Sequence, residues 1–173
     1  MESIRNIIRN VPDFPKPGIL FKDITPLLQD PKTGAAIISE FRKRLEGVRV
    51  DAILGVESRG FLFGYALALQ MGVPFVPVRK SGKLPWKTIG TEYELEYGKA
   101  KIEMHEDALK PGSKVIIHDD LLATGGTAAA AARLVQMAEC EVSAFAFVVE
   151  LGFLEGRKNL ADHSGTVISL VEY

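Results

Sequence analysis

The sequence predicts an α/β domain built on a mainly parallel, twisted sheet with helices on both of its faces. Short apolar stretches that suit buried strands alternate with longer stretches that suit helices, as in consecutive strand–helix–strand units. The chain has 173 residues, of which 47% are hydrophobic, enough for one well-buried core. No repeat, low-complexity tract or linker interrupts it, so we expect a single domain over residues 1–173.

The expected elements follow one another along the chain. A short amphipathic helix comes first, then a loop rich in proline and glycine at 12–18, and Asp30-Pro31 begins a helix over about 33–45. Strands are expected at 50–55, 73–78, 100–104, 114–118, 142–149 and 166–171. Further helices are expected at 61–71, 127–138 and 153–160. Residues 80–98 form a long polar stretch that we expect to be irregular, which in a small domain indicates a functional flap or disorder.

Composition and charge exclude several classes of protein. The 21 basic and 22 acidic residues nearly cancel, so the chain lacks the positive field that attracts nucleic acid or anionic membranes. Its most apolar stretch, 60–78, is broken by Gly72, Pro74 and Pro77 and is too short to span a bilayer. Cys140 is the single cysteine, so neither an internal disulfide nor a cysteine-rich zinc site can form. The first residues lack the apolar core of a signal peptide. We therefore expect a cytoplasmic protein with no nucleic-acid or membrane partner.

The segment VIIHDDLLATGGTAAAAARL at 115–134 carries the clearest functional signal. A buried strand ends in Asp119 and Asp120, and a loop of small residues then leads directly into a helix: Ala123, Thr124, Gly125, Gly126 and Thr127. Glycines let the backbone approach an anion, and the first amides and the dipole of a helix favour its charge. Paired carboxylates beside such a site suit the hydroxyls of a sugar phosphate. The alternatives are an ordinary strand–turn–helix connection with an acidic turn and, less favoured, a nucleotide-hydrolysing loop, whose Gly-Lys-Ser/Thr ending is absent.

Several blocks together resemble one known family. HDDLLATGGT at 118–127 resembles the phosphoribosyl diphosphate signature of the type I phosphoribosyltransferases. Four more blocks resemble, in the same order, those of the members that act on adenine: FPKPGILFKDITPLL at 14–28, GVESRGFLFG at 55–64, VRKSGKLP at 78–85 and ELEYGKAKIE at 94–103. The resemblance implies the type I phosphoribosyltransferase fold, with a small N-terminal hood over about 1–30 and a flexible lid over about 80–98.

The same resemblance implies a reaction and its partners. The 5-phosphoribosyl group would pass from phosphoribosyl diphosphate to adenine, giving AMP and pyrophosphate in purine salvage. The enzyme would act as a homodimer with Mg²⁺. No cluster of side chains has metal-ligand spacing, so we expect no direct metal ligand and expect Mg²⁺ to arrive with the substrate phosphates. The ribose and its 5-phosphate would lie against Asp119, Asp120 and the loop at 123–127.

The pyrophosphate end would be held by two segments. The loop ESRG at 57–60 can bind the leaving group with its amides and the Arg59 guanidinium, whereas the alternative is a helix start with a surface arginine. Lysines and arginines are concentrated around Gly82 in a pattern typical of a lid that closes on phosphates, and the alternative is a solvated run of charge. The candidate pyrophosphate-binding residues are Glu57, Ser58, Arg59, Arg79, Lys80 and Lys83. By resemblance, Arg79 and Lys80 lie near the dimer interface.

The base end is expected in the hood and at the end of the lid. Phe21 suits stacking on a purine, and the backbone of Leu20 and Phe21 can read the purine edge, although a core phenylalanine is the alternative. Lys22 stands where many relatives carry arginine, and it joins the base-binding candidates with Tyr97. The resemblance makes Glu96 the candidate for proton transfer from adenine and, with Arg59, a catalytic residue. Without the resemblance, Glu96 and Tyr97 would be part of a solvated acidic face.

Two other functions remain open from the sequence. A phosphoribosyltransferase for another purine, xanthine or hypoxanthine, would keep the signature and change the base pocket. A non-catalytic regulator could use the fold to sense phosphoribosyl diphosphate, but it would normally need an added DNA-binding module with a basic face, which does not fit a chain of 173 residues at net charge −1. His118 is expected to be a buried strand histidine with a backbone partner, and Trp86 to pack or to anchor the lid.

Overall fold

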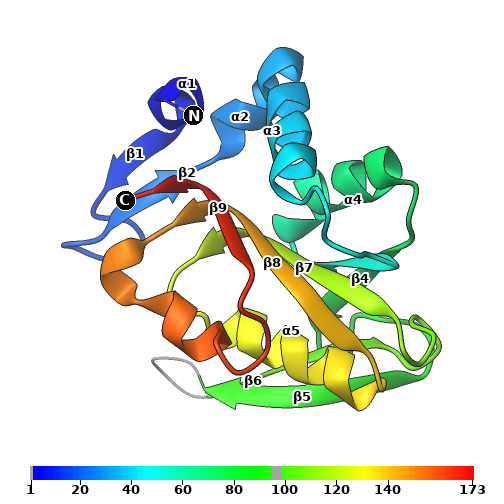
Figure 1. Cartoon of the computed structure of the whole chain (residues 1–173). Coiled ribbons are helices and arrows are strands. Elements are labelled where there is room, and N and C mark those ends of the chain that lie inside the picture. Colours follow the sequence, from blue (N-terminus) through cyan, green and yellow to red (C-terminus); the bar gives the residue numbers. More distant parts are fainter. Residues whose placement is uncertain (1, 95–98) are drawn as a thin grey trace.

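The computed structural model describes residues 2–94 and 99–173, and Figure 1 shows how their elements are arranged. The strands in these ranges are β1 (Arg9–Pro12), β2 (Leu20–Asp23), β3 (Ala52–Val56), β4 (Phe75–Lys80), β5 (Thr88–Glu94), β6 (Lys99–His105), β7 (Lys114–Leu122), β8 (Glu141–Glu150) and β9 (Val167–Glu172). The helices are α1 (Glu2–Ile7), α2 (Thr25–Gln29), α3 (Pro31–Arg44), α4 (Gly60–Met71) and α5 (Gly126–Met137), with 3₁₀ turns η1 (Gly152–Leu154) and η2 (Gly156–Leu160). None of the helices in these ranges is long and apolar enough to cross a membrane.

The main sheet has seven strands in the order β5-β6-β4-β3-β7-β8-β9. Five adjacent strands run parallel to one another, in the order β4-β3-β7-β8-β9. Strand β6 is antiparallel to both β4 and β5. The chain passes from β3 outward to β4 on one side and from β7 outward to β8 on the other, so the carboxyl ends of β3 and β7 flank the crevice that such sheets use for ligands. The predicted α/β fold with a mainly parallel sheet is confirmed.

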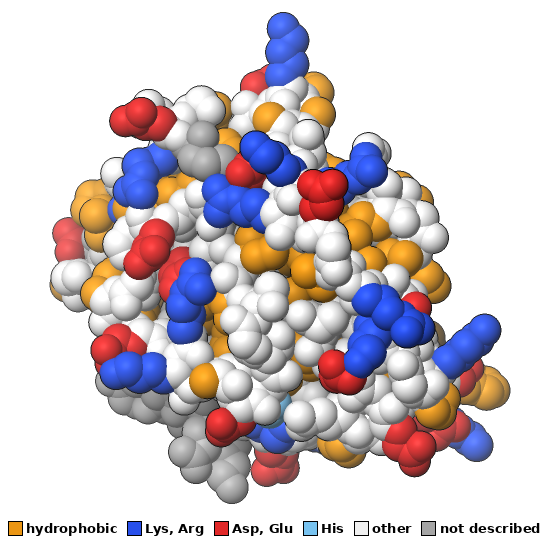
Figure 2. Space-filling view, in the orientation of Figure 1, with side chains coloured by type: hydrophobic (Ala, Val, Ile, Leu, Met, Phe, Trp, Pro, Cys, Tyr) orange, Lys and Arg blue, Asp and Glu red, His pale blue; other side chains and the backbone are white. Residues whose placement is uncertain are grey.

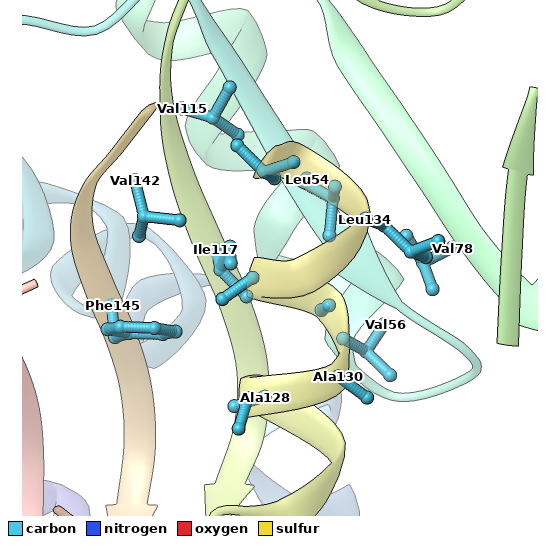
Figure 3. Packing of buried hydrophobic residues seen from close by; sticks show 14 of the residues in the cluster. Leu54, Val56, Val78, Val115, Ile117, Ala128, Ala130, Leu134, Val142 and Phe145 are labelled. Atoms are coloured by element: carbon cyan, nitrogen blue, oxygen red, sulfur yellow. The ribbon is translucent and has the colours of Figure 1, made fainter. Parts of the chain in front are cut away.

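Helices cover both faces of the sheet and separate two apolar cores. Strand alternation sends Leu54 and Val56 to the face under α5, while Ile53 between them packs on the face under α3 and α4. Figure 3 shows Ala128, Ala130 and Leu134 of α5 directed at the strands. Ala128 to Ala132 are all buried, and their small side chains bring α5 close to β7. This close packing fixes where α5 begins, and with it the loop that precedes the helix.

Local sequence signals explain the limits of the helices. Asp30 caps α3, because its carboxylate accepts hydrogen bonds from the N–H groups of Lys32 and Thr33, both at 3.1 Å, and Pro31 occupies the first turn. Helix α4 ends at Gly72, whose φ of 69° is the left-handed conformation that glycine adopts most easily. Both boundaries agree with the predicted helices to within three residues.

The structure corrects the expectation of an irregular stretch over 80–98. Thr88–Glu94 is strand β5, which pairs residue by residue with β6. Ile89 and Tyr93 of this strand pack against the core under α5, so the apolar positions alternate as a strand requires. The polar residue Thr91, between these two inward positions, hides that alternation in the sequence. The flexibility of the lid stays a prediction, and residues 95–98 lie outside the described residues.

The hood contains a two-stranded sheet that the sequence did not predict. Strands β1 and β2 pair antiparallel from Arg9↔Asp23 to Pro12↔Leu20, on either side of the proline- and glycine-rich segment. The end of β9 lies beside them (Figure 1). There the centre of the Tyr173 ring is 3.8 Å from the Lys22 ammonium and 4.7 Å from the guanidinium carbon of Arg5. The hood is therefore attached to the last strand of the main sheet.

Candidate active site

The predicted phosphate-binding segment forms a small cavity at the end of β7. We call residues 123–127 the phosphate loop. A cavity of about 80 Å³ is lined by Asp119 and by residues 121–128. Gly125 has a φ of 83° and immediately precedes α5, so the first amides of the helix, which have no partner within it, are available at the cavity. The structure brings together Ala123, Thr124, Gly125, Gly126 and Thr127 as the sequence predicted.

A larger hollow lies away from this chemistry. It measures about 920 Å³ and is lined by α2, α3 and α4, including Leu28, Ile38, Leu62 and Met71. None of the residues lining it is a candidate site residue. The site is therefore assigned from its functional groups and their place at the ends of β3 and β7 rather than from the size of a hollow.

The two neighbouring aspartates have different surroundings. Consecutive side chains of a strand point to opposite faces, and only Asp119 lines the phosphate cavity. Asp120 is buried, with 4% of its surface exposed, and its Oδ2 lies 2.9 Å from Arg59 Nε. Burial and the charge of Asp120 raise the pKa of Asp119 well above its ordinary value. Burial also raises the pKa of Asp120, an effect that the Arg59 charge opposes.

Close backbone packing holds these groups at the junction of β3, α4 and β7. A Cβ on Gly60, the first residue of α4, would lie 2.9 Å from both Asp119 Oδ1 and the His118 carbonyl oxygen. Only glycine therefore allows α4 to start so near β7. The Asp119 Oδ1 atom also accepts a hydrogen bond from the Asp120 N–H at 2.8 Å. This packing places the loop after β3 beside the end of β7.

Arg59 links the aspartates to the base end of the site. Its guanidinium carbon lies 5.3 Å from the centre of the Phe21 ring, which in turn packs edge to face on Phe14 at 5.1 Å. Phe21 is only partly buried, so the core position considered for it is wrong, and Leu20 beside it is half exposed. Arg59, Asp120 and Phe21 thus form a continuous line from the sheet to the hood.

The structure places Lys22 differently from its neighbour Phe21. The Lys22 ammonium donates a hydrogen bond to Asn10 Oδ1 at 2.7 Å and lies over the Tyr173 ring. Burial, with the nearby Arg5 charge, lowers the pKa of Lys22. The side chain is therefore engaged by the hood and by β9, and its role in base binding stays a prediction.

The predicted pyrophosphate residues gather around the Glu57 carboxylate. Arg79 donates to Glu57 at 2.8 Å, the Lys80 N–H donates at 3.1 Å, and the Lys83 ammonium lies 4.0 Å away. The hydrogen bond from Arg79 is the main cause that holds the pKa of Glu57 below its ordinary value. The Glu57–Ser58 peptide is cis. These side chains lie next to the Arg59 loop, so the two predicted pyrophosphate segments meet in space.

Sequence reasoning missed one anchor of the expected lid. Glu103 of β6 is buried and accepts hydrogen bonds from the Ser81 hydroxyl, from the Gly82 N–H at 3.1 Å and from Lys101, whose ammonium lies 3.0 Å away. These donors lower the pKa of Glu103 to about 2. The first turn after β4 is therefore fastened to the sheet. The available signal was a charged residue at an inward position of the strand predicted at 100–104.

The other residues singled out from the sequence are a buried histidine, an exposed tryptophan and two residues at the end of the expected lid. His118 is fully buried against Phe41, and burial lowers its pKa to about 4. Neither ring nitrogen reaches a partner at hydrogen-bonding geometry among the described residues, although the nearby Ala146 backbone opposes the effect of burial on the pKa. Trp86 is 63% exposed, so its expected packing is not seen. The catalytic candidate Glu96 and the base-binding candidate Tyr97 lie outside the described residues.

Metal-ligating side chains do not cluster in the described parts of the chain. Over residues 2–94 and 99–173, no group of three or more His, Cys, Asp or Glu side chains is placed to hold a metal ion. The site instead combines an amide-lined phosphate cavity, a carboxylate on its wall, a guanidinium and an aromatic ring. Such a set can bind a phosphorylated sugar beside a flat, apolar base.

Comparison with known proteins agrees with this geometry. Residues 24–169 match the family described as the phosphoribosyl transferase domain. The adenine phosphoribosyltransferase of Cytophaga hutchinsonii is 49% identical over 172 residues, which are 99% of this chain and 95% of that protein. The crystal structure of the adenine phosphoribosyltransferase from Thermoanaerobacter pseudethanolicus superposes with a TM-score of 0.96 at 52% identity and covers 99% of both chains.

A third comparison includes ligands. The adenine phosphoribosyltransferase of Saccharomyces cerevisiae, solved with an imino-altritol bisphosphate and adenine, has a TM-score of 0.92 at 43% identity and covers 98% of this chain and 97% of that one. The fold and the site define a phosphoribosyltransferase. The chain belongs to this family and, within it, to the adenine phosphoribosyltransferases.

Proposed function

We infer that the protein transfers the 5-phosphoribosyl group from 5-phospho-α-D-ribose 1-diphosphate to adenine, giving AMP and pyrophosphate. The observation that carries this inference is that Arg59 pairs with Asp120, next to the carboxylate that lines the phosphate cavity, and also lies against the Phe21 ring. The chain that carries this arrangement matches adenine phosphoribosyltransferases along nearly its whole length. Phosphoribosyltransferases for xanthine or hypoxanthine, and a non-catalytic regulator, gain no support from these comparisons.

The proposed placement of the sugar follows from the phosphate loop. The 5-phosphate would accept hydrogen bonds from the loop amides and the Thr124 and Thr127 hydroxyls. Asp119 is the carboxylate nearest to that cavity and would accept a hydrogen bond from a ribose hydroxyl. Asp120 would take part chiefly by holding Arg59, because the two side chains already form an ion pair at 2.9 Å.

The proposed leaving-group site lies at the other end of the ribose. As the bond to pyrophosphate breaks, negative charge grows on the leaving group and must be stabilised. The Arg59 guanidinium and the cations held around Glu57, namely Arg79, Lys80 and Lys83, would supply that stabilisation. Mg²⁺ would bind through the diphosphate oxygens, which are the hard ligands it prefers, and would neutralise part of their charge.

The proposed base site uses main-chain groups and one ring. Phe21 would stack on adenine, and the carbonyl and N–H groups near Leu20 and Phe21 would pair with its edge. Adenine presents an amine donor beside an acceptor nitrogen, whereas hypoxanthine presents the opposite pattern. Glu96 remains our candidate for accepting the proton that adenine loses, and Tyr97 our candidate for a further base contact.

A turnover assay tests the proposed function. Adenine, hypoxanthine, guanine and xanthine are each supplied with phosphoribosyl diphosphate and Mg²⁺, and pyrophosphate release is measured. We expect adenine to be preferred by roughly 10⁴-fold in kcat/KM, because mismatched bases leave buried polar groups unpaired. Comparable kcat/KM values for adenine and hypoxanthine would overturn the adenine assignment.

We also propose that the protein is a homodimer in the cytoplasm. Leu62, Tyr65 and Leu69 are 47%, 55% and 64% exposed, and their spacing places them on one face of α4. Figure 2 shows further hydrophobic side chains between α3 and α4, beside the large hollow. Apolar surface of this kind is typical of subunit interfaces. Light scattering should give twice the mass of 18.9 kDa, and Tyr65→Glu should lower it to the monomer value.

A further inference from the structure

A second stretch of backbone lies directly against the phosphate loop. A Cβ built on Gly125 would lie 2.4 Å from the Gly156 carbonyl oxygen, and a Cβ on Gly156 would lie 2.2 Å from the Ala123 carbonyl oxygen. Neither position accepts a side chain without movement of the backbone. The phosphate loop therefore rests on the first residue of η2, a segment some thirty positions further along the chain.

Asn159 of η2 makes the one side-chain hydrogen bond found between these two segments in the described residues. Its Nδ2 donates to the Thr124 carbonyl oxygen at 2.7 Å. The Thr124–Gly125 peptide is trans, so the Thr124 carbonyl and the Gly125 N–H point in opposite directions. Asn159 thus fixes the direction of the Gly125 N–H, for which no protein acceptor is found in the part of the chain that the structure describes.

The turn that carries Asn159 is itself firmly anchored. Arg157 forms two hydrogen bonds with the buried carboxylate of Glu150, both at 2.7 Å, and donates a third to the Val167 carbonyl at 3.0 Å. The hydrogen bonds from Arg157 hold the pKa of Glu150 below its ordinary value. Leu160 at the end of η2 is fully buried. Asn159 therefore projects from a segment fixed on either side of it.

We propose that Asn159 is a positioning residue for phosphate binding: it holds the Thr124 carbonyl away from the cavity so that the Gly125 N–H faces the 5-phosphate of the substrate. Asn159 acts through the loop and does not touch the substrate. The inference rests on the proposed placement of the phosphate at residues 123–127. It assigns a role in the reaction to η2, which contains none of the residues predicted for the site.

The test compares AMP with adenosine, which differ only in the 5-phosphate. Dissociation constants for both are measured by calorimetry for the wild type, Asn159→Ala, Lys158→Ala and Gly126→Val. Lys158→Ala is the matched control, because it truncates the neighbouring exposed side chain, whose ammonium pairs with Glu155 at 2.6 Å. Steady-state kinetics add KM for phosphoribosyl diphosphate and KM for adenine.

We expect Asn159→Ala to weaken AMP binding roughly tenfold, as for one poorly aligned hydrogen bond to a charged group, and to leave adenosine binding and KM for adenine unchanged. Lys158→Ala should leave the ratio of the AMP and adenosine affinities at its wild-type value. The inference is overturned if the ratio of AMP affinity to adenosine affinity in Asn159→Ala stays within about twofold of the wild-type ratio while the same ratio falls in Gly126→Val. If Gly126→Val also keeps the ratio, the phosphate lies elsewhere, and both the proposed phosphate placement and the role of Asn159 are wrong.

Discussion

The phosphate loop and the base-binding strand of the hood would hold opposite ends of one substrate pair, and they are built differently. The small residues of the phosphate loop leave its backbone accessible at the cavity, and the loop leads directly into α5 and packs against Gly156. Strand β2 pairs with β1, Leu20 on it is half exposed, and Phe21 makes side-chain contacts with Phe14 and Arg59. Binding at the phosphate end therefore depends on the path of the backbone, whereas the base end also has side-chain contacts that a substitution can remove one at a time.

The largest expected effect is the loss of the backbone path at Gly125. Valine there would meet the Gly156 carbonyl and would have to adopt a φ of 83°. We expect Gly125→Val to lower kcat/KM for phosphoribosyl diphosphate by about 1,000-fold or more, equivalent to roughly 4 kcal/mol. Adenosine binding, measured by calorimetry, should change much less.

Gly47 provides the matched control for that variant. Its φ of 82° is nearly the same, but a Cβ there would meet no atom within 4 Å. Gly47→Val should therefore lower the unfolding temperature through backbone strain and leave the kinetics unchanged. Equal kinetic losses in the two variants would show that strain alone, and not the contact with Gly156, explains the result.

The same comparison shows what could be predicted from the sequence. The phosphate site was predictable because Asp119 and the phosphate loop lie within nine consecutive residues, 119–127, between a strand and a helix that each have a clear pattern. The hydrogen bond from Asn159 to Thr124 joins residues 35 positions apart, and no local pattern encodes it. It exists because β7 and β8 pair up to Leu122 and Glu150, which brings η2 over the loop.

The base end was predictable only in part, for a related reason. The resemblance pointed to Phe21, but the contacts that hold it come from Phe14 in the loop between β1 and β2 and from Arg59 at the start of α4. The pairing of β1 with β2 was missed because proline and glycine between them indicate a loop and conceal two strands of four residues each. Strand β5 was missed because a polar residue, Thr91, stands between Ile89 and Tyr93 on its inward face.

A second prediction concerns the buried half of the site, where His118 precedes the aspartates on β7. Its pKa is about 4 in the folded protein, against an ordinary value of 6.5. Between these two pH values the unfolded chain binds a proton that the folded chain does not, so this contribution to stability is complete above pH 6.5 and is lost as the pH falls toward 4. The shift corresponds to about 3 kcal/mol.

Urea unfolding of the wild type and of His118→Leu at pH 7 and at pH 4.5 measures this contribution. Leucine does not titrate and fills a similar volume, so the free energy of unfolding should fall less between the two pH values in His118→Leu than in the wild type. Asp119 and Asp120 have raised pKa values, which act in the opposite direction, but they are common to both proteins. Identical pH dependence in the two proteins would mean that His118 titrates normally.

A third prediction tests Arg59, the residue that connects the two ends of the site. Arg59→Ala removes a positive charge from the proposed pyrophosphate site and leaves the Asp120 carboxylate buried without its partner. We expect kcat to fall about 100-fold, and the protein to be destabilised by the unpaired charge. Stopped-flow turnover and thermal unfolding measure the two effects separately.

The double variant Arg59→Ala with Asp120→Asn separates those effects. Removal of the carboxylate charge should restore most of the stability, because no unpaired ion is then buried, while kcat should stay low. Recovery of kcat together with stability would show that Arg59 acts only by holding the fold. A loss confined to AMP affinity would instead place Arg59 with the phosphate and not with the leaving group.

The smallest expected effect is at the base end, where Phe21 contributes one of several contacts. Phe21→Ala should weaken adenine binding by about tenfold, because base–aromatic stacking contributes roughly 1–3 kcal/mol and the neighbouring backbone groups remain in place. KM for phosphoribosyl diphosphate should change little, since the phosphate loop lies on the main sheet and not in the hood. Phe153→Ala is the control. It removes the same type of side chain from an exposed position, since Phe153 on η1 is 73% exposed.

The preference for adenine over hypoxanthine should persist in Phe21→Ala, because main-chain groups near Leu20 and Phe21 would read the purine edge and the ring would not. If the preference disappears with the ring, the base is selected by side-chain packing, and the contrast between the two ends of the site extends to specificity as well as affinity.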